Sequence, residues 1–259
     1  MIAENEEYIL ELLGKGVREH DRDRMQYRDI KIQTGTIPHA EGSAMVDIGN
    51  TKVLVGVKLD IGTPLKDKPD EGALVTSAEL LPLANAEYET GPPSPESIEF
   101  ARVVDRGIRA AGVVDTDALF IEKDKVWTAY VDIYVLNYDG NLFDAGTLAS
   151  VSALLSARMP KYEDEKVIRE GNLGKLKTGG IVTSCTFAKV GKNILLDPNA
   201  NEERIMAGRL TIANDESVLR AMQKGESGSF SYKELTELVD ATFDNSKRLR
   251  DMIKGAVGD

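Results

Sequence analysis

The chain has 259 residues and a formal net charge of −11, a size that allows one large domain or two medium ones. Its composition is ordinary for a globular protein, and it contains no run of about eighteen apolar residues that would predict a membrane span. The acidic balance argues against nucleic-acid binding through bulk charge, so any RNA contact requires a local basic patch or a partner chain. The lone cysteine, Cys185, excludes an internal disulfide. Together with an acidic N-terminus that lacks a signal-peptide core, it predicts a cytoplasmic location.

The first third of the chain predicts a helix followed by antiparallel strands. Apolar residues at helical spacing predict a helix over residues 4–16, and a charge-dense segment follows it. Alternating side chains predict a strand over residues 28–35. A Gly-Asn pair predicts the turn of a hairpin within residues 42–60. Residues 62–93 are rich in proline, glycine and acids, which indicates loops around one short apolar segment at residues 73–83.

Two helices are predicted in the middle of the chain. Residues 94–96 combine a hydroxyl N-cap, a proline at the first helical position and an acid in the first turn, so a helix begins there and runs to about residue 111. Strands are predicted over residues 118–122 and 126–138. The second helix, at residues 142–159, has several small residues that allow close packing on a sheet.

The last third predicts a connection and a second lobe. Residues 162–178 are charged and broken by glycines. Strands are predicted at 181–190, 193–196 and 206–213, a short element at 219–225 and a final helix at 232–253. We therefore expect three parts: an N-terminal helix and charged segment at residues 1–28, a first lobe at 29–160 and a second lobe at 178–254.

Three arginines of the central helix are candidate phosphate ligands. Arg102, Arg106 and Arg109 are spaced i, i+4 and i+7, which puts all three guanidinium groups on one helix face. The planar guanidinium donates two hydrogen bonds per phosphate contact. The alternative is a solvated face on which Arg102 and Arg109 pair with Glu99 and Asp105. Spacing alone leaves both interpretations open.

Three carboxylates that follow a predicted strand form a second candidate site. Clustered acids such as Asp197, Glu202 and Glu203 could hold a metal ion or perform acid–base chemistry. The alternative is an acidic helix start, in which Asn199 or Asn201 is the N-cap and the two glutamates favour the positive end of the helix dipole.

The histidines add no metal-binding or catalytic motif. His20 lies in the charged segment, and His39 follows Pro38 in a predicted turn. The sequence has no glycine-rich phosphate loop and no zinc-ligand spacing. We therefore expect no bound metal and no cofactor.

Several motifs resemble the RNase PH family over about residues 20–253. They are the hairpin around Gly49-Asn50-Thr51-Lys52-Val53, the helix start at 97–102, the strand ending at Asp139-Gly140, and the segment 194–203 with Arg209. Residues 102–106 and 149–154 resemble most the non-catalytic RNase PH-like subunits of the archaeal exosome. The resemblance implies an α/β fold of two βαβα-type lobes with mixed sheets and packed helices.

The resemblance also implies that the reaction chemistry is lost. Active members bind phosphate at a helix N-terminus, hold RNA with an arginine pair on the central helix, and place two aspartates six residues apart in the second lobe. The residues at these positions here are Asn141-Leu142-Phe143, Pro95-Glu96, and Glu203 with Arg209. Apolar side chains donate no hydrogen bonds and Asp144 would repel an anion, so the chain is expected to lack a phosphorolytic site of its own.

A structural and RNA-gripping role follows from the resemblance. The chain would alternate with a catalytic RNase PH-like subunit in a heterohexameric ring, with cap subunits that carry RNA-binding domains, and would support 3′ to 5′ phosphorolytic RNA degradation by that partner. Arg102, Arg106 and Arg109 would contact RNA phosphates. Two alternatives stay open: a stand-alone RNase that uses the carboxylates Asp197, Glu202 and Glu203, and a ring protein without RNA contact.

Overall fold

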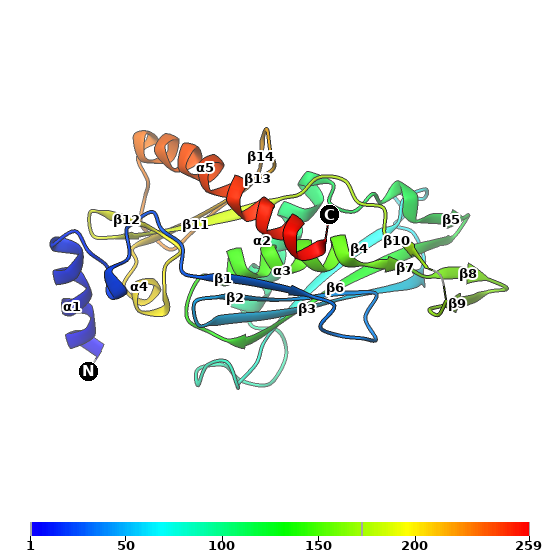
Figure 1. Ribbon diagram of the computed structural model, residues 1–259, viewed down its shortest axis with the longest axis horizontal. Helices are drawn as coiled ribbons and strands as arrows, with labels where there is room; N and C mark the ends of the chain where they lie inside the picture. Colours follow the sequence, from blue (N-terminus) through cyan, green and yellow to red (C-terminus); the bar gives the residue numbers. More distant parts are fainter. Residues whose placement is uncertain (1, 172, 259) are drawn as a thin grey trace.

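The computed structural model describes residues 2–171 and 173–258 as two sheets with helices packed between and against them (Figure 1). The larger sheet has the strand order β1-β2-β3-β6-β4, with β5 beside one end of β6. All its pairings are antiparallel except that of β4 with β6. Its strands are β1 (Ile30–Thr34), β2 (Gly42–Ile48), β3 (Thr51–Gly62), β4 (Ala73–Leu80), β5 (Phe120–Glu122) and β6 (Lys125–Asn137).

The predicted hairpin is confirmed, whereas the apolar segment after it has a larger role than expected. Gly49 takes the left-handed conformation in the turn between β2 and β3, with φ 56°. The segment predicted only as an apolar stretch among loops forms β4, the edge strand that lies parallel to β6. Its register partner is more than fifty residues away, so local sequence patterns do not show the pairing.

The smaller sheet is antiparallel and has the strand order β12-β11-β13-β14. Its strands are β11 (Thr183–Val190), β12 (Asn193–Leu196), β13 (Gly208–Asn214) and β14 (Leu219–Gly225). The short helix α4 (Ala200–Arg204) joins β12 to β13, and the long helix α5 (Tyr232–Val257) packs across β11 and β13. The predicted second-lobe strands and final helix are therefore confirmed.

The connection between the two sheets forms short strand pairs. These are β7 (Arg158–Met159) with β10 (Gly174–Lys175), and β8 (Lys161–Glu163) with β9 (Lys166–Ile168). The β8–β9 hairpin extends away from the rest of the chain (Figure 1). Tyr162 anchors its base through an edge-on ring contact with Trp127, at a centroid distance of 6.4 Å. Residue 172, which belongs to the predicted connection, lies outside the described residues.

Two helices between the sheets form the centre of the core. These are α2 (Pro95–Ala111) and α3 (Leu142–Ser156). The predicted N-cap is confirmed, because the Ser94 hydroxyl accepts a hydrogen bond from the Ser97 N–H, and Gly112 ends α2 in the left-handed conformation. Every residue of α3 from Leu142 to Leu154 is buried, since the helix packs on β2 and β3 on one side and on β11 on the other.

The N-terminal helix α1 (Ile2–Gly14) packs on the second sheet rather than on the first. Ile9 and Leu13 form a small apolar cluster with Ala188, Val190 and Leu195. Ile9 and Leu13 are spaced i and i+4, so they lie on one face of α1, whereas Tyr8 and Leu10 are exposed. The N-terminal segment therefore crosses from the second lobe to β1, the first strand of the other sheet.

We predict that the packing of α3 against α2 tolerates no added methyl group at Gly146. A Cβ there would lie 2.5 Å from two ring carbons of Phe100, and that ring is buried against Phe143. Gly146→Ala should lower the free energy of unfolding by about 1–3 kcal/mol, the range for overpacking a core. Gly255→Ala in α5 is the matched control, because a Cβ there meets no atom within 4 Å. It should be neutral or stabilising by up to about 1 kcal/mol. Equal urea midpoints for both variants would contradict the packing argument.

Candidate functional site

The N-terminus of α3 lies where the resemblance places phosphate binding, and a carboxylate of this chain occupies it. Asn141 precedes the helix in the left-handed conformation, with φ 55°. Its backbone N–H donates to Glu203 Oε1 at 2.9 Å. The positive end of a helix attracts anions through such free N–H groups. The position that would attract an external anion is therefore already filled by the Glu203 side chain.

Glu203 is held there by a second hydrogen bond. The Tyr138 hydroxyl donates to Glu203 Oε2 at 2.6 Å. Burial raises the pKa of Glu203, against hydrogen bonds from Tyr138 and Asn141 that lower it. The next two residues of α3, Leu142 and Phe143, are apolar and buried, so they offer no further donor side chain. This loop therefore presents a carboxylate acceptor from the chain itself and no donor side chain from residues 142 and 143.

Arg209 is fixed next to this helix end, but its ion-pair partner is not Glu203. Its Nη2 lies 2.6 Å from Glu99 Oε1. The guanidinium carbon lies 4.2 Å from the centroid of the Phe143 ring, a cation–π contact. On β14, Gly225 leaves room for it, since a Cβ there would come within 2.6 Å of Arg209 Nη2. The site therefore combines a stacked arginine with glutamates, where active members have paired aspartates.

Glu203, Arg209 and the start of α3 line a hollow of about 510 Å³. Its charged lining is mainly acidic: Glu87, Glu96, Glu99, Glu203 and Glu226, with Arg204 and Arg209 as the cations. A surface of this sign repels polyanions at close range. The hollow therefore lacks the positive field that a phosphate or an RNA strand would require.

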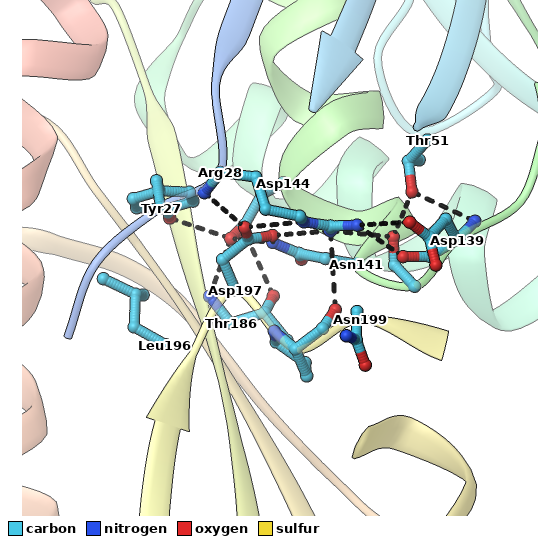
Figure 2. Close-up of polar contacts among 12 residues, drawn as sticks. Tyr27, Arg28, Thr51, Asp139, Asn141, Asp144, Thr186, Leu196, Asp197 and Asn199 are labelled. Atoms are coloured by element: carbon cyan, nitrogen blue, oxygen red, sulfur yellow. Dashed lines mark hydrogen bonds and ion pairs between the residues drawn. The ribbon is translucent and has the colours of Figure 1, made fainter. Parts of the chain in front are cut away.

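Asp197 and Glu202 form ion pairs with arginines of the N-terminal segment and are buried. Figure 2 shows the part of this ion cluster around Asp197 and Arg28. Arg18 binds Glu202 through two hydrogen bonds of 2.7 and 2.5 Å. Arg28 donates to both carboxylate oxygens of Asp197 at 2.8–2.9 Å. Arg22 adds a contact of 2.8 Å to Asp197. Two carboxylates are thus surrounded by three arginines in a region closed to solvent.

The electrostatics of this cluster follow from burial and pairing. Burial alone would raise the pKa of Asp197, but hydrogen bonds and charge from Arg28 hold it below its ordinary value. Burial and the neighbouring Arg18 lower the pKa of Arg22 to about 10. Asn141 also donates its side-chain amide to Asp197 Oδ1 at 2.7 Å, which ties the ion cluster to the start of α3.

The acidic helix start is confirmed as the role of the sequence around residue 200. Asn199 caps α4 and forms a capping box, in which its side chain accepts from the Glu202 N–H and Glu202 accepts from the Asn199 N–H, both at 2.9 Å. Of the three candidate catalytic carboxylates, Asp197 and Glu202 share the arginine cluster, whereas Glu203 is bound by Tyr138 and the Asn141 N–H. Among residues 2–171 and 173–258, no group of three or more metal-ligating side chains could hold a metal ion.

Asp144 was expected to repel an anion, and the structure gives it another role. Its carboxylate points into the core, where it accepts hydrogen bonds from the Tyr27 hydroxyl at 2.8 Å and from the Thr186 N–H and hydroxyl at 2.9 Å (Figure 2). The side chain is fully buried, and burial raises its pKa to about 6. Asp144 therefore links β11 to the N-terminal segment and does not face the hollow.

The predicted arginine face of α2 is present and exposed, but its three members differ in their contacts. Arg109 pairs with Asp105 at 2.6 Å and also donates to the carbonyl of Leu74 on β4. Arg106 donates to Gln223 Oε1 at 3.0 Å. Among the residues that the structure describes, Arg102 has no hydrogen-bond or ion-pair partner. The suggested pairing of Arg102 with Glu99 is wrong, because Glu99 binds Arg209.

The sequence matches two domain families in succession. Residues 26–160 match the 3′ exoribonuclease family, domain 1 (RNase PH), and residues 180–245 match domain 2 of the same family. The chain belongs to the RNase PH family. None of the helices within the described residues is long and apolar enough to cross a membrane.

Relatives and solved structures of this family are similar over nearly the whole chain. A protein of Thermococcus gammatolerans named Exosome complex component Rrp42 is 44% identical, over 96% of this chain and 94% of the relative. One of the same name from Aeropyrum pernix is 42% identical, over 93% of this chain and 90% of the relative.

The fold is also that of solved structures from the family. A chain from the Archaeoglobus fulgidus exosome with RNA bound to the active site superposes with a TM-score of 0.91 at 38% identity, covering 96% of this chain and 98% of the other. Rice Rrp46, at 16% identity and a TM-score of 0.70 over 93% of this chain and all of the other, shares the fold.

The sequence interpretation missed two arginines of the buried ion cluster, Arg18 and Arg22. The RNase PH domain match begins at residue 26, so Arg18 and Arg22 lie before it, in a segment read only as charge-dense. Their partners are 175 to 184 residues away, and no local spacing indicates them. The one signal in the sequence was charge. A short arginine-rich segment precedes the first lobe, and the second lobe contains an acidic loop with which these arginines could pair.

We predict that removing the charge of Asp197 destabilises the chain strongly and in a pH-dependent way. Asp197→Asn leaves buried arginines without their partner, which should lower the free energy of unfolding by about 3–5 kcal/mol at pH 7. The pKa of Asp197 is lowered in the folded chain, so its contribution is present above the unfolded value of about 3.9 and is lost as pH falls through the folded value.

Urea unfolding between pH 3 and pH 7 checks this prediction, and the difference between wild-type and variant should shrink below about pH 4. Glu237→Gln is the control, because Glu237 forms an exposed pair of 3.8 Å with Lys233 and should cost less than about 0.5 kcal/mol. A difference that stays constant over the whole pH range would contradict the ionic role of Asp197.

Proposed function

We propose that this chain is a non-catalytic, RNA-gripping subunit of an archaeal exosome ring. It would alternate with a catalytic RNase PH-like subunit in a heterohexamer, beneath cap subunits with RNA-binding domains, in the cytoplasm. The partner would perform 3′ to 5′ phosphorolytic RNA degradation. Support comes from near-full-length relatives named Exosome complex component Rrp42 and from the similarity to chains of archaeal exosome structures, one of them with RNA bound.

The observation that carries the non-catalytic assignment is the hydrogen bond from the Asn141 N–H to Glu203. A phosphate would have to displace a half-buried carboxylate that is also bound by Tyr138. Displacement would leave that carboxylate without its two donors, and a charge that is partly removed from water and unpaired is costly. No arginine or hydroxyl side chain replaces it, because Leu142 and Phe143 follow. The helix end thus lacks both space and ligands for phosphate.

The stand-alone RNase that would use Asp197, Glu202 and Glu203 is not favoured. A general base needs a free lone pair near its substrate and a pKa close to the working pH. Asp197 is buried and bound by Arg22 and Arg28. Burial acts to raise its pKa, but the hydrogen bonds and charge of Arg28 hold that pKa below its ordinary value. Glu202 is fully engaged by Arg18 and by the capping box. Neither carboxylate is therefore placed to activate water or to bind a metal.

The RNA contact is proposed for Arg102 and Arg106. Both are exposed on one face of α2, and their charges are not offset by a bound carboxylate. Arg109 is held by Asp105 and by the Leu74 carbonyl, so much of its charge and donor capacity is used within the chain. In a chain with a net charge of −11, these two exposed arginines on one helix face supply the local basic patch that RNA contact requires.

We expect the purified chain alone to release no nucleoside diphosphate from RNA in phosphate buffer. The blocked α3 N-terminus and the acidic hollow explain this result. Nucleoside diphosphates resolved by chromatography provide the measurement, with a catalytic subunit of an archaeal exosome assembled with this chain as the positive control. Release by the isolated chain above the level of a mock preparation would refute the assignment.

A repaired loop should also stay inactive. The triple change Asn141→Gly, Leu142→Ser and Phe143→Arg supplies a hydroxyl and an arginine, but Glu203 and Arg209 remain. The same product measurement tests it, and activity in this variant would show that the loop alone had lost the function.

We predict that Arg102→Glu with Arg106→Glu weakens RNA binding by the assembled ring about tenfold or more. Each phosphate contact is a charge-assisted hydrogen bond worth roughly 1.5–3 kcal/mol at most. The loss should be similar for all RNA sequences, because phosphates carry no sequence information. The plot of log affinity against log salt should also flatten by about 0.7 per lost contact.

The matched control makes the same change in net charge at a different helix of the chain. Lys247→Glu with Arg248→Glu alters two exposed cations of α5 and should leave RNA affinity nearly unchanged. Ring mass is compared first, and affinity is then measured at two salt concentrations. Equal affinities and equal salt slopes for both double variants would leave the chain as scaffold without RNA contact.

A further inference from the structure

One contact ties the arginine face of α2 to the second lobe. Arg106 Nη1 donates to Gln223 Oε1 at 3.0 Å, across 117 residues of sequence. Arg106 is the member of the row with a neutral side-chain partner, whereas Arg109 binds the carboxylate of Asp105. A neutral acceptor fixes the direction of a guanidinium and leaves its charge in place.

Gln223 can fix the direction of the Arg106 guanidinium because the backbone of Gln223 is itself held in the sheet. On β14 it lies opposite Thr211 of β13, and two neighbouring pairs on the same face are Gly225 with Arg209 and Ala221 with Ala213. That face of the sheet packs under α2, where a Cβ at Gly107 would lie 3.6 Å from the Ala213 Cβ. The Gln223 amide also donates weakly to the Lys224 carbonyl at 3.4 Å, which orients its oxygen toward Arg106.

We infer that Gln223 is a positioning residue that holds Arg106 ready for an RNA phosphate without neutralising it. The inference rests on the proposed RNA contact of α2. A guanidinium has five N–H donors, and the bond to Gln223 uses one of them, so a bidentate pair stays available for phosphate oxygens. Ordering a long side chain before RNA arrives removes part of the entropy that binding would otherwise cost.

A carboxylate at the same position would act in the opposite way. It would bind the guanidinium as an ion pair, as Asp105 does with Arg109, and would compete with phosphate for the same donors. An apolar side chain of equal length would preserve the packing of β14 but would release Arg106 from its fixed direction. The apolar substitution therefore tests the orientation of Arg106, and the carboxylate substitution tests its free charge.

The test compares Gln223→Met and Gln223→Glu in the ring assembled with its catalytic partner, each with and without Arg106→Ala. Ring mass and melting temperature are checked first, and Gln223→Ala replaces the methionine variant if that ring does not assemble. We expect Gln223→Met to weaken binding of single-stranded RNA by about two- to tenfold with an unchanged salt slope, because Arg106 keeps its charge. Gln223→Glu should weaken binding and flatten the slope by about 0.7, as Arg106→Ala does.

In the Arg106→Ala background, Gln223→Met should have no further effect on RNA affinity. An equal loss in both backgrounds would show that Gln223 acts other than through Arg106, and no loss in the wild-type background would show that Arg106 needs no positioning. Either result overturns the inference. If Arg106→Ala itself leaves affinity and slope unchanged, the proposed RNA contact of Arg106 fails instead.

Discussion

The buried ion cluster around Asp197 and Glu202 is the constraint on which the arrangement at the N-terminus of α3 depends. Asp197 has a left-handed backbone, with φ 51°, directly after β12, and Arg28 holds its side chain on both oxygens. Buried carboxylates are tolerated only when they are paired and hydrogen-bonded. The loop after β12 must therefore keep Asp197 beside Arg28 and Glu202 beside Arg18, which fixes where α4 begins. Glu203 belongs to α4, so the position of α4 places the Glu203 carboxylate at the N-terminus of α3.

The same loop also requires close backbone contact with the first lobe. Gly140 has φ 79°, and a Cβ there would come within 2.4–2.7 Å of the backbone between Pro198 and Ala200. Its carbonyl accepts from the Thr51 hydroxyl at 2.6 Å, and the same hydroxyl accepts from the Asp139 N–H at 3.1 Å (Figure 2). The turn of the first hairpin, the start of α3 and the acidic loop of the second lobe thus form one hydrogen-bonded unit. A substitution that shifts the backbone of one of these three segments would therefore shift the backbone of the other two.

Local patterns predicted most elements, because capping, turn and periodicity signals are local. Ser94 and Asn199 start their helices as the N-cap rule requires, and the spacing of Arg102 and Arg106 placed both on one exposed face. Pairings between distant residues were not predictable in this way. Three such pairings are the parallel pairing of β4 with β6, the Arg18–Glu202 ion pair, and the pairing of Glu99 with Arg209 and not with Arg102. Each joins segments that meet only in the folded chain. Charge alone allows many such pairings, and burial selects among them.

A helix N-terminus with free N–H groups must find acceptors, whether or not it binds phosphate. In this chain the acceptor for the Asn141 N–H is Glu203, and the side-chain amide of Asn141 is taken by Asp144 and Asp197. Removing phosphate ligands from the loop without supplying that carboxylate would leave a buried donor unpaired and destabilise the packing of α3. Arg209 offsets the charge of Glu99. Burial raises the pKa of Glu203, and the charge of Arg209 acts against that rise. The Glu203 carboxylate is thus an internal acceptor for the N-terminus of α3, which explains how this helix end stays paired within the RNase PH fold.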